Sequence, residues 1–154
     1  MKIITPLLFT LIIISGCATI HRVENLQGSD LRQINVRTLE ADYKTTYNIV
    51  IEALKSEGFN IADAYESTGI IQTSKRMTNI FKFLLSGPEV FSYEVTLTEV
   101  SSKQTEIELL YHEFRMMNWH WYNVDKMLSV ETYRSQIDRI FNKINLLLEG
   151  KFST

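Results

Sequence analysis

The chain contains little cysteine, which could cross-link the fold, and little proline or glycine, which interrupt helices and strands. Its 154 residues include one cysteine, two prolines and six glycines. A single thiol excludes an intramolecular disulfide, so the fold must be held by packing alone. From Val124 to Glu149 there is neither proline nor glycine, and such a stretch is free to form one long helix.

An excess of positive charge is also lacking. The chain has 16 basic and 18 acidic residues, for a formal net charge of −2. Nucleic-acid-binding proteins neutralise phosphates with clustered lysine and arginine, and anionic lipid headgroups attract the same clusters. The sequence contains no such cluster, so we expect no nucleic-acid partner.

Recognisable catalytic patterns are missing as well. The three histidines are His21, His112 and His120, and their spacing does not match a zinc site. There is no G-x-S-x-G, no H-E-x-x-H and no phosphate-binding glycine loop. We therefore expect no catalytic residue, no metal site, no cofactor and no enzyme. An enzyme would become credible only if His112, Glu113 and His120 converged in a cleft.

The one long hydrophobic run lies at the N-terminus. Lys2 provides a basic start, residues 3–14 are mostly apolar, and Ser15-Gly16 precede the lone Cys17. A transmembrane helix needs about 18 apolar residues, and this run has about 12, interrupted by Pro6. The proline and the flanking lysine also disfavour a buried core helix. The order basic, apolar, small is typical of a cleavable secretion signal.

The end of this segment, Ile14-Ser15-Gly16-Cys17, resembles the lipobox of bacterial lipoproteins. The resemblance implies that Cys17 receives a diacylglycerol, that the peptide is cut before it, and that an acyl chain such as palmitate is often added to its amino group. Two or more acyl chains hold a protein stably on a bilayer. In such proteins an Asp after the cysteine favours the inner membrane. Ala18 therefore implies an outer-membrane lipoprotein facing the periplasm, if the host has two membranes.

After this N-terminal segment, the spacing of apolar residues is typical of a helix in some stretches and of a strand in others. We expect a candidate strand over Leu31–Leu39, a helix over Asp42–Glu57 that Gly58 ends, and a hairpin of residues 59–66 and 70–75. Strict alternation over residues 89–98 and 105–114 predicts two strands with one buried face. Val124–Glu149 predicts the long helix. Its apolar stripe consists of Val130, Tyr133, Ile137, Ile140, Ile144 and Leu147, widened by Met127, Phe141 and Leu148.

These stretches predict an α+β fold in two layers, in the order (β)-α-β-β-β-β-α. An antiparallel sheet of four to five strands would pack against the long C-terminal helix and the shorter N-terminal helix. The expected organisation is a signal peptide over residues 1–16, a lipidated tether over 17–30 and a single domain over 31–150.

The segment from Tyr47 to Thr73, with Gly58-Phe59-Asn60-Ile61 and Ser67-Thr68-Gly69-Ile70-Ile71-Gln72-Thr73, resembles a pattern of envelope lipoproteins. It is similar to the helix-grip domains of the lipoprotein C subunit of the β-barrel assembly machinery. The resemblance implies an antiparallel sheet gripping a long terminal helix. The chain departs from that family because it has room for one such domain and its tether is short.

Two apolar segments are candidates for an interaction surface. Ile80–Leu85 includes Phe81, Phe83 and Leu84 in the loop between the second and third strands. It either tucks into the core, which avoids exposing a large apolar patch, or projects to touch a partner or the bilayer.

The second segment is Trp119-His120-Trp121-Tyr122, which follows two methionines. Trp119 and Trp121 either form an interface hot spot or cap the core at a strand-to-helix corner, where indoles reach water. We favour capping at such a corner.

The leading functional hypothesis is a non-catalytic, lipid-anchored envelope protein. It would act as an accessory or scaffold subunit of an outer-membrane complex through contacts with other envelope proteins. The alternative is a periplasmic carrier or sensor that binds an apolar ligand between sheet and helix. A carrier needs about 300 Å³ or more of apolar space, and a scaffold needs none.

Overall fold

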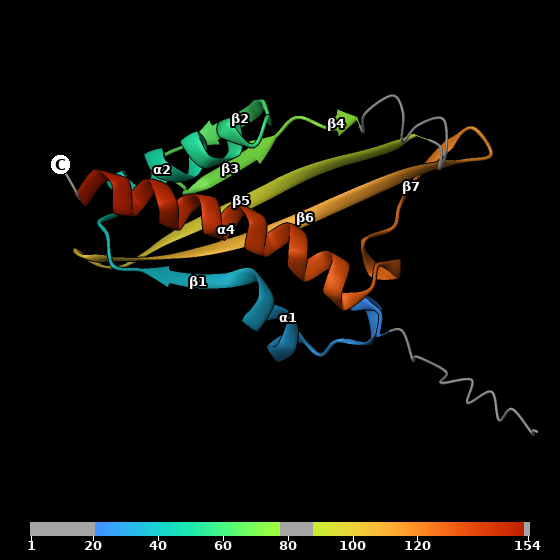
Figure 1. The fold of residues 1–154 in the computed structure, drawn as a ribbon, viewed down its shortest axis with the longest axis horizontal. Coiled ribbons are helices and arrows are strands. Elements are labelled where there is room, and N and C mark those ends of the chain that lie inside the picture. Colours follow the sequence, from blue (N-terminus) through green and yellow to red (C-terminus); the bar gives the residue numbers. More distant parts are fainter. Residues whose placement is uncertain (1–20, 78–87, 153–154) are drawn as a thin grey trace, which may run out of the picture.

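The computed structural model describes residues 21–77 and 88–152 of the chain. They form an α+β fold in two layers, in which helices pack on one face of an antiparallel sheet (Figure 1). The predicted fold class is thereby confirmed. The sheet has seven strands in the described ranges, however, and not the four to five that were expected.

The elements follow one another in a simple order. The first half contains η1 (Val23–Asn25), α1 (Gly28–Asn35), β1 (Val36–Leu39), α2 (Tyr43–Ser56), β2 (Ile61–Tyr65), β3 (Ile70–Thr73) and β4 (Arg76–Met77). The second half contains β5 (Glu89–Ser101), β6 (Gln104–Met117), β7 (His120–Asn123), η2 (Asp125–Met127) and α4 (Val130–Phe152).

The hairpin of β5 and β6 forms the centre of the sheet. The main strand order is β1-β6-β5-β3-β2, and β4 and β7 add to β5 and β6 at one end. β5 and β6 pair from Glu89 opposite Arg115 to Ser101 opposite Gln104. Two strands of 13 and 14 residues are each about 45 Å long, so the hairpin gives the molecule its long axis.

Apolar and polar side chains alternate along this hairpin, which gives it one buried face and one face that is open to solvent, as predicted. The opposed pairs Tyr93–Tyr111, Val95–Leu109 and Leu97–Ile107 are all buried beneath the helices. The side chains between them, such as Ser92 and Glu94, point to the other face and are half-buried. One face of the sheet therefore supplies half of the core.

The helices supply the other half. Asp42 caps α2 by accepting a hydrogen bond from the Thr45 N–H at 2.9 Å. Gly58 follows the end of α2 with φ 82°, as predicted. α4 is about 34 Å long and lies across the sheet (Figure 1). The predicted stripe of α4 faces the core, because Ile137, Ile140 and Ile144 have no exposed surface.

The N-terminal part of the domain differs from expectation. Leu31–Leu39 is a strand only from Val36, because α1 extends through Asn35 and buries Ile34 against the core. Residues 21–30, expected to be tether, contain η1 and the start of α1. Val23 is buried and its N–H donates to the Leu128 carbonyl at 3.0 Å. The mixed polar composition of this segment hid the packing of its few apolar side chains.

The segment before α4 also differs. The long helix begins at Val130 and not at Val124, because η2 and Ser129 intervene, and the Ser129 hydroxyl accepts from the Thr132 N–H at 3.1 Å as a cap. Met127, expected to widen the stripe, is 56% exposed. β4 and β7 are the strands that the prediction missed. Both are too short for their alternation to be recognised.

Candidate interaction surfaces

The turn between β6 and β7 is strained. Met117 pairs with His120, which leaves Asn118 and Trp119 as a two-residue turn with φ values of 50° and 66°. Such a turn needs positive φ at both positions and normally places glycine at the second. A bulky residue in this left-handed region costs free energy, and strain of this kind concentrates at functional sites. The fold therefore holds an indole where glycine would be more stable.

The side chains around this turn form an exposed surface that we call the tip patch. It consists of Met77, Pro88, Met116, Asn118, Trp119 and Trp121, which together line an open hollow of about 610 Å³. Trp119 is 91% exposed and Trp121 is 43% exposed. The expectation that this segment caps the core at a corner is wrong, because β7 pairs with β6 and carries the aromatic residues past the end of the helix layer.

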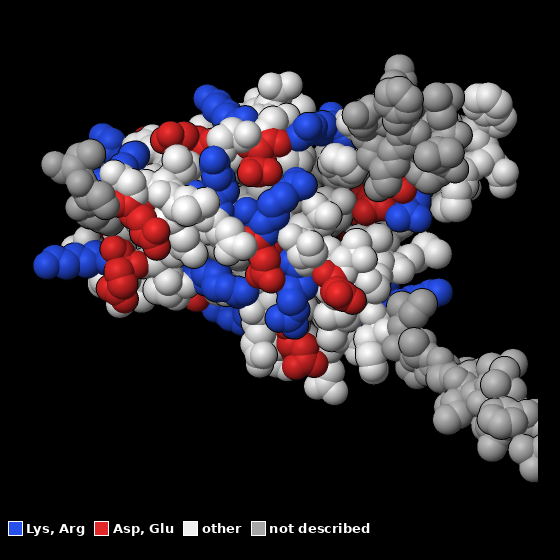
Figure 2. All heavy atoms as spheres, in the orientation of Figure 1, with Lys and Arg blue, Asp and Glu red and all other residues white. Residues whose placement is uncertain are grey.

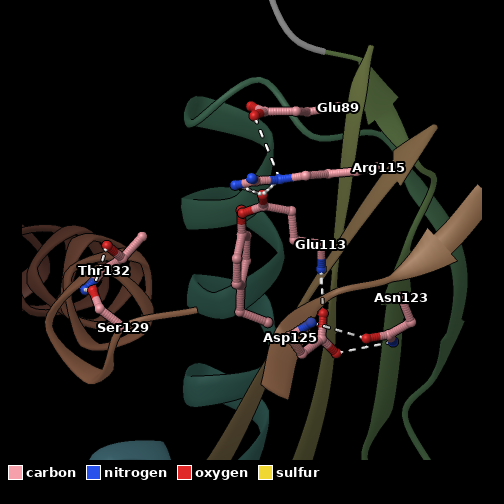
Figure 3. Close-up of polar contacts among 8 residues, drawn as sticks. Glu89, Glu113, Arg115, Asn123, Asp125, Ser129 and Thr132 are labelled. Carbon is pink, nitrogen blue, oxygen red and sulfur yellow. Dashed lines mark hydrogen bonds and ion pairs between the residues drawn. The ribbon is translucent and has the colours of Figure 1, made fainter. Parts of the chain in front are cut away.

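An ion-pair network of two buried carboxylates and the partly exposed Arg115 joins β5 and β6 beside the tip patch (Figure 3). Glu89 and Glu113 are buried side chains, and the guanidinium of Arg115 lies between them, 3.6 Å from Glu89 and 2.7 Å from Glu113. The Tyr111 hydroxyl donates to the second oxygen of Glu113 at 3.0 Å. Buried carboxylates stay charged only when they are paired and hydrogen-bonded, so this network locks the ends of β5 and β6 together.

A second network ties β7 to β6 through Asp125 (Figure 3). One oxygen of Asp125 accepts from the Glu113 N–H, and the other accepts from the Asn123 amide at 3.0 Å and contacts His112 Nδ1 at 2.8 Å. The hydrogen bond with Asp125 raises the pKa of His112 above its ordinary value, although partial burial opposes the shift. Burial raises the pKa of Tyr111, and the adjacent Glu113 raises it further.

His112 and His120 have separate partners. The ring of His112 contacts Asp125, whereas His120 Nδ1 contacts the Asn118 carbonyl at 2.9 Å in the exposed turn. Within the described ranges no group of three or more His, Cys, Asp or Glu side chains could hold a metal ion. The arrangement around Asp125 is that of a structural brace.

A larger hollow lies along β6 between β1 and β7, with a volume of about 820 Å³. Its apolar wall includes Val23, Leu26, Leu31 and Leu110. It opens at the edge of the sheet and reaches Tyr111 of β6 and Tyr133 at the start of α4, whereas Ile137, Ile140 and Ile144 further along α4 are fully buried. Along the middle of α4 the side chains fill the space between sheet and helix, and this edge hollow is the apolar space that the start of α4 shares with β6.

β2 forms one end of the strand order, and no strand of the described residues pairs with its outer edge. Its last four side chains, Ala62, Asp63, Ala64 and Tyr65, are all exposed. Edge strands offer unpaired backbone groups to which a partner's strand can add. The register shift between Ile61 and Asp63 limits this edge to a short length, which protects it from indiscriminate pairing.

The predicted site residues fall into two groups. Trp119 and Trp121 lie together in the tip patch. Cys17, Phe81, Phe83 and Leu84 lie outside the described residues. Met77 and Pro88 also belong to the tip patch, and the sequence did not indicate them. The pairing of β4 with β5 positions Met77, and the Pro88 carbonyl accepts from the Met116 N–H at 3.2 Å. In the ranges 21–77 and 88–152, no helix is long and apolar enough to span a bilayer.

Comparisons with known proteins show weak likenesses. No family model matches the chain. No curated protein matches it either. The adenylate sensor from AMP-activated protein kinase, solved in complex with 5-aminoimidazole-4-carboxamide 1-beta-D-ribofuranotide, is 13% identical with a TM-score of 0.47, covering 70% of this chain and 93% of that chain. A DUF4468 family protein from Bacteroides ovatus is 10% identical with a TM-score of 0.37, covering 76% of this chain and 82% of that chain. Neither likeness carries an argument about function.

Proposed function

We propose that this chain is a lipid-anchored envelope protein that acts by binding other proteins. It would serve as a non-catalytic accessory or scaffold subunit of an outer-membrane complex, moored through Cys17 and facing the periplasm. The lipobox-like sequence before Cys17 supports the anchor, and the outer edge of β2 is the observation that supports the protein contact.

The edge of β2 suits a protein partner for two reasons. A strand that adds to it gains main-chain hydrogen bonds, and the side chains on alternate positions provide selectivity. The two alanines leave room for another backbone to approach, and Tyr65, which is 56% exposed, offers a large aromatic contact at the end of the strand.

The test is photo-crosslinking in intact cells of the full chain. A photoreactive residue in place of Ala64 should give a discrete protein adduct. The same residue in place of Leu146, which is 64% exposed on α4, is the matched control and should give none. Tyr65→Lys, with the reporter kept at position 64, should abolish the adduct because charge blocks edge pairing, while the melting temperature stays unchanged. Equal labelling at both positions would rule out the assigned edge.

A carrier remains the second candidate because of the edge hollow beside β6. Its volume of about 820 Å³ exceeds what a small apolar ligand needs. Native mass spectrometry of the purified protein separates the two functions. A carrier should retain a bound lipid-sized molecule, and Leu110→Trp should expel it by filling the hollow.

A further inference from the structure

The first described residues, which we call the exit point, are held against the start of α4. The Val130 N–H donates to the His21 carbonyl at 2.8 Å, and the backbones of Arg22 and Ser129 pair in an isolated antiparallel β-bridge. Val23 is buried just behind them. These contacts attach the exit point to the start of α4, so any force applied through the lipid is transmitted to the body of the domain.

The exit point and the tip patch lie at the same end of the molecule. Figure 1 shows the start of α4, the first described residues before η1 and the β6–β7 turn at one end of the long axis, with the C-terminal end of α4 at the other. Four peptide steps separate Cys17 from His21. Fully extended, they span at most about 14 Å. A lipidated Cys17 therefore keeps this end of the molecule close to the bilayer surface.

The tip patch has the chemistry of a membrane interface. Residues 116–123 contain two tryptophans, a tyrosine and two methionines, and no Asp, Glu, Lys or Arg. Tryptophan and tyrosine concentrate at the headgroup level of bilayers, where the ring is buried and its polar atom stays wet. In Figure 2 the described atoms at the outer margin of this end are uncharged, and acidic and basic side chains appear further in.

The nearest charges suit an interfacial position. Glu89 and Glu113 are buried, and Arg115, which pairs with both, is 47% exposed and directly precedes Met116. The exposed Lys75 lies with its ammonium 4.1 Å from the centre of the Phe114 ring. Phe114 precedes Met116 by two residues on β6, so Lys75 lies further from the turn than the tip patch does. A lysine in that position can reach phosphate groups while the aromatic residues ahead of it enter the interface.

We infer that the tip patch enters the interface of the bilayer that holds the Cys17 lipid, and so forms a second membrane contact. This inference rests on the lipid anchor of the proposed function. Two contacts fix the orientation of a rigid body that a flexible tether alone would leave free to turn. The strained turn aims Trp119 at the bilayer, and the long hairpin holds the β2 edge away from the lipid for a protein partner.

The chain provides its own reporter, because its only two tryptophans are Trp119 and Trp121. The lipidated full chain, with the mass of modified Cys17 verified, is reconstituted into vesicles of phosphatidylethanolamine and phosphatidylglycerol. Tryptophan emission should move to shorter wavelength, brominated lipids should quench it, and aqueous iodide should quench it severalfold less than it quenches an exposed indole.

The matched control moves the reporter to the opposite end. Trp119→Phe and Trp121→Phe combined with Val100→Trp place the single indole beside the β5–β6 turn, where Val100 is 55% exposed. This reporter should remain fully accessible to iodide and untouched by brominated lipids. A difference between the two proteins then reports on the tip alone.

Three results would overturn the inference. If the native tryptophans are quenched by iodide as strongly as the Val100→Trp reporter while Cys17 is lipidated, the tip stays in water and the proposed anchor still stands. If Cys17 from the native host is bare, the anchor and the inference fail together. Shielding that requires added membrane proteins, and does not occur with pure lipid, would assign the tip patch to a protein partner.

Discussion

At the scale of single residues, Trp119 and Gly69 present opposite cases of positive φ. Trp119 is a bulky side chain at φ 66°, where glycine would be relaxed. Gly69 has φ 72° in the β2–β3 hairpin, and an added Cβ would collide with the Leu97 carbonyl oxygen. The backbone of Trp119 is strained, and its indole is exposed. Position 69 takes glycine because no other residue fits.

Trp119→Gly should therefore remove an exposed aromatic residue without weakening the fold. We expect the free energy of unfolding to stay constant or to rise by up to about 1 kcal/mol, because the left-handed turn is relieved. Urea denaturation followed by circular dichroism measures this change. A loss of more than about 1 kcal/mol would show that the indole packs in the folded state.

Gly69→Ala is the counterpart. The substitution combines an unfavourable φ with a backbone collision, so we expect a loss of about 2 kcal/mol or more in the free energy of unfolding. The melting temperature should fall accordingly. Gly150→Ala serves as the control, because an added Cβ there meets nothing within 4 Å.

His112 should make stability depend on pH. Its pKa is raised from the ordinary 6.5, first by the hydrogen bond with Asp125 and also by the charges of Asp125 and Glu94. The folded state then binds the proton more tightly than the unfolded state does. The stabilisation is fully present below about pH 6.5 and is lost as the pH rises through the folded pKa of His112.

The contribution should be about 0.3–1 kcal/mol because the pair is partly exposed to solvent. The wild-type protein should lose this amount of unfolding free energy between about pH 5.5 and pH 8.5 relative to His112→Asn. Denaturation curves of the two proteins across that range test the expectation. Parallel pH profiles would mean that the pair adds nothing.

At the scale of elements, α4 illustrates how far periodicity reaches. Its stripe of isoleucines was identified from three- and four-residue spacing, and Ile137, Ile140 and Ile144 are indeed fully buried. Its start was misplaced by six residues, because the capping Ser129 and the Asp125 brace act through contacts that the helical period does not record. β7 was not predicted for the same reason, because it exists through its pairing with β6 and not through a pattern of its own.

Ile140→Asp should unfold the domain. The side chain has no exposed surface, and an unpaired charge there costs several kcal/mol. Leu146→Asp introduces the same charge on the same helix at a side chain that is 64% exposed, and should change stability by about 0.5 kcal/mol or less. Thermal melts of the two variants compare the faces directly. Similar melting temperatures would show that the stripe does not face the core.

At the scale of the whole molecule, the elongated shape allows the two proposed contacts to lie apart. The proposed anchor would direct the end with the exit point and the tip patch toward the membrane. The hairpin of β5 and β6, joined near the tip by the ion pairs of Arg115 with Glu89 and Glu113, spans the long axis between the two ends.

Cys17→Ser tests the anchor in the native host. Without the thiol no diacylglycerol can be attached, and we expect an uncut precursor that is lost from the outer-membrane fraction. Fractionation and intact mass measure both properties. Ala18→Ser changes the neighbouring residue and should leave cleavage and membrane retention intact. Normal processing of the Cys17 variant would refute the lipobox interpretation.

The amino-acid sequence by itself determined the α+β class, the faces of β5, β6 and α4, and the caps of α2, because these follow from period and local hydrogen bonding along one segment. Tertiary structure alone decided the rest. β4 and β7 exist only by pairing with longer strands, and Glu89 meets Glu113 only across a hairpin. The same pairing converts two tryptophans from an expected core cap into an exposed tip, since the position of a side chain relative to water depends on every layer of the fold.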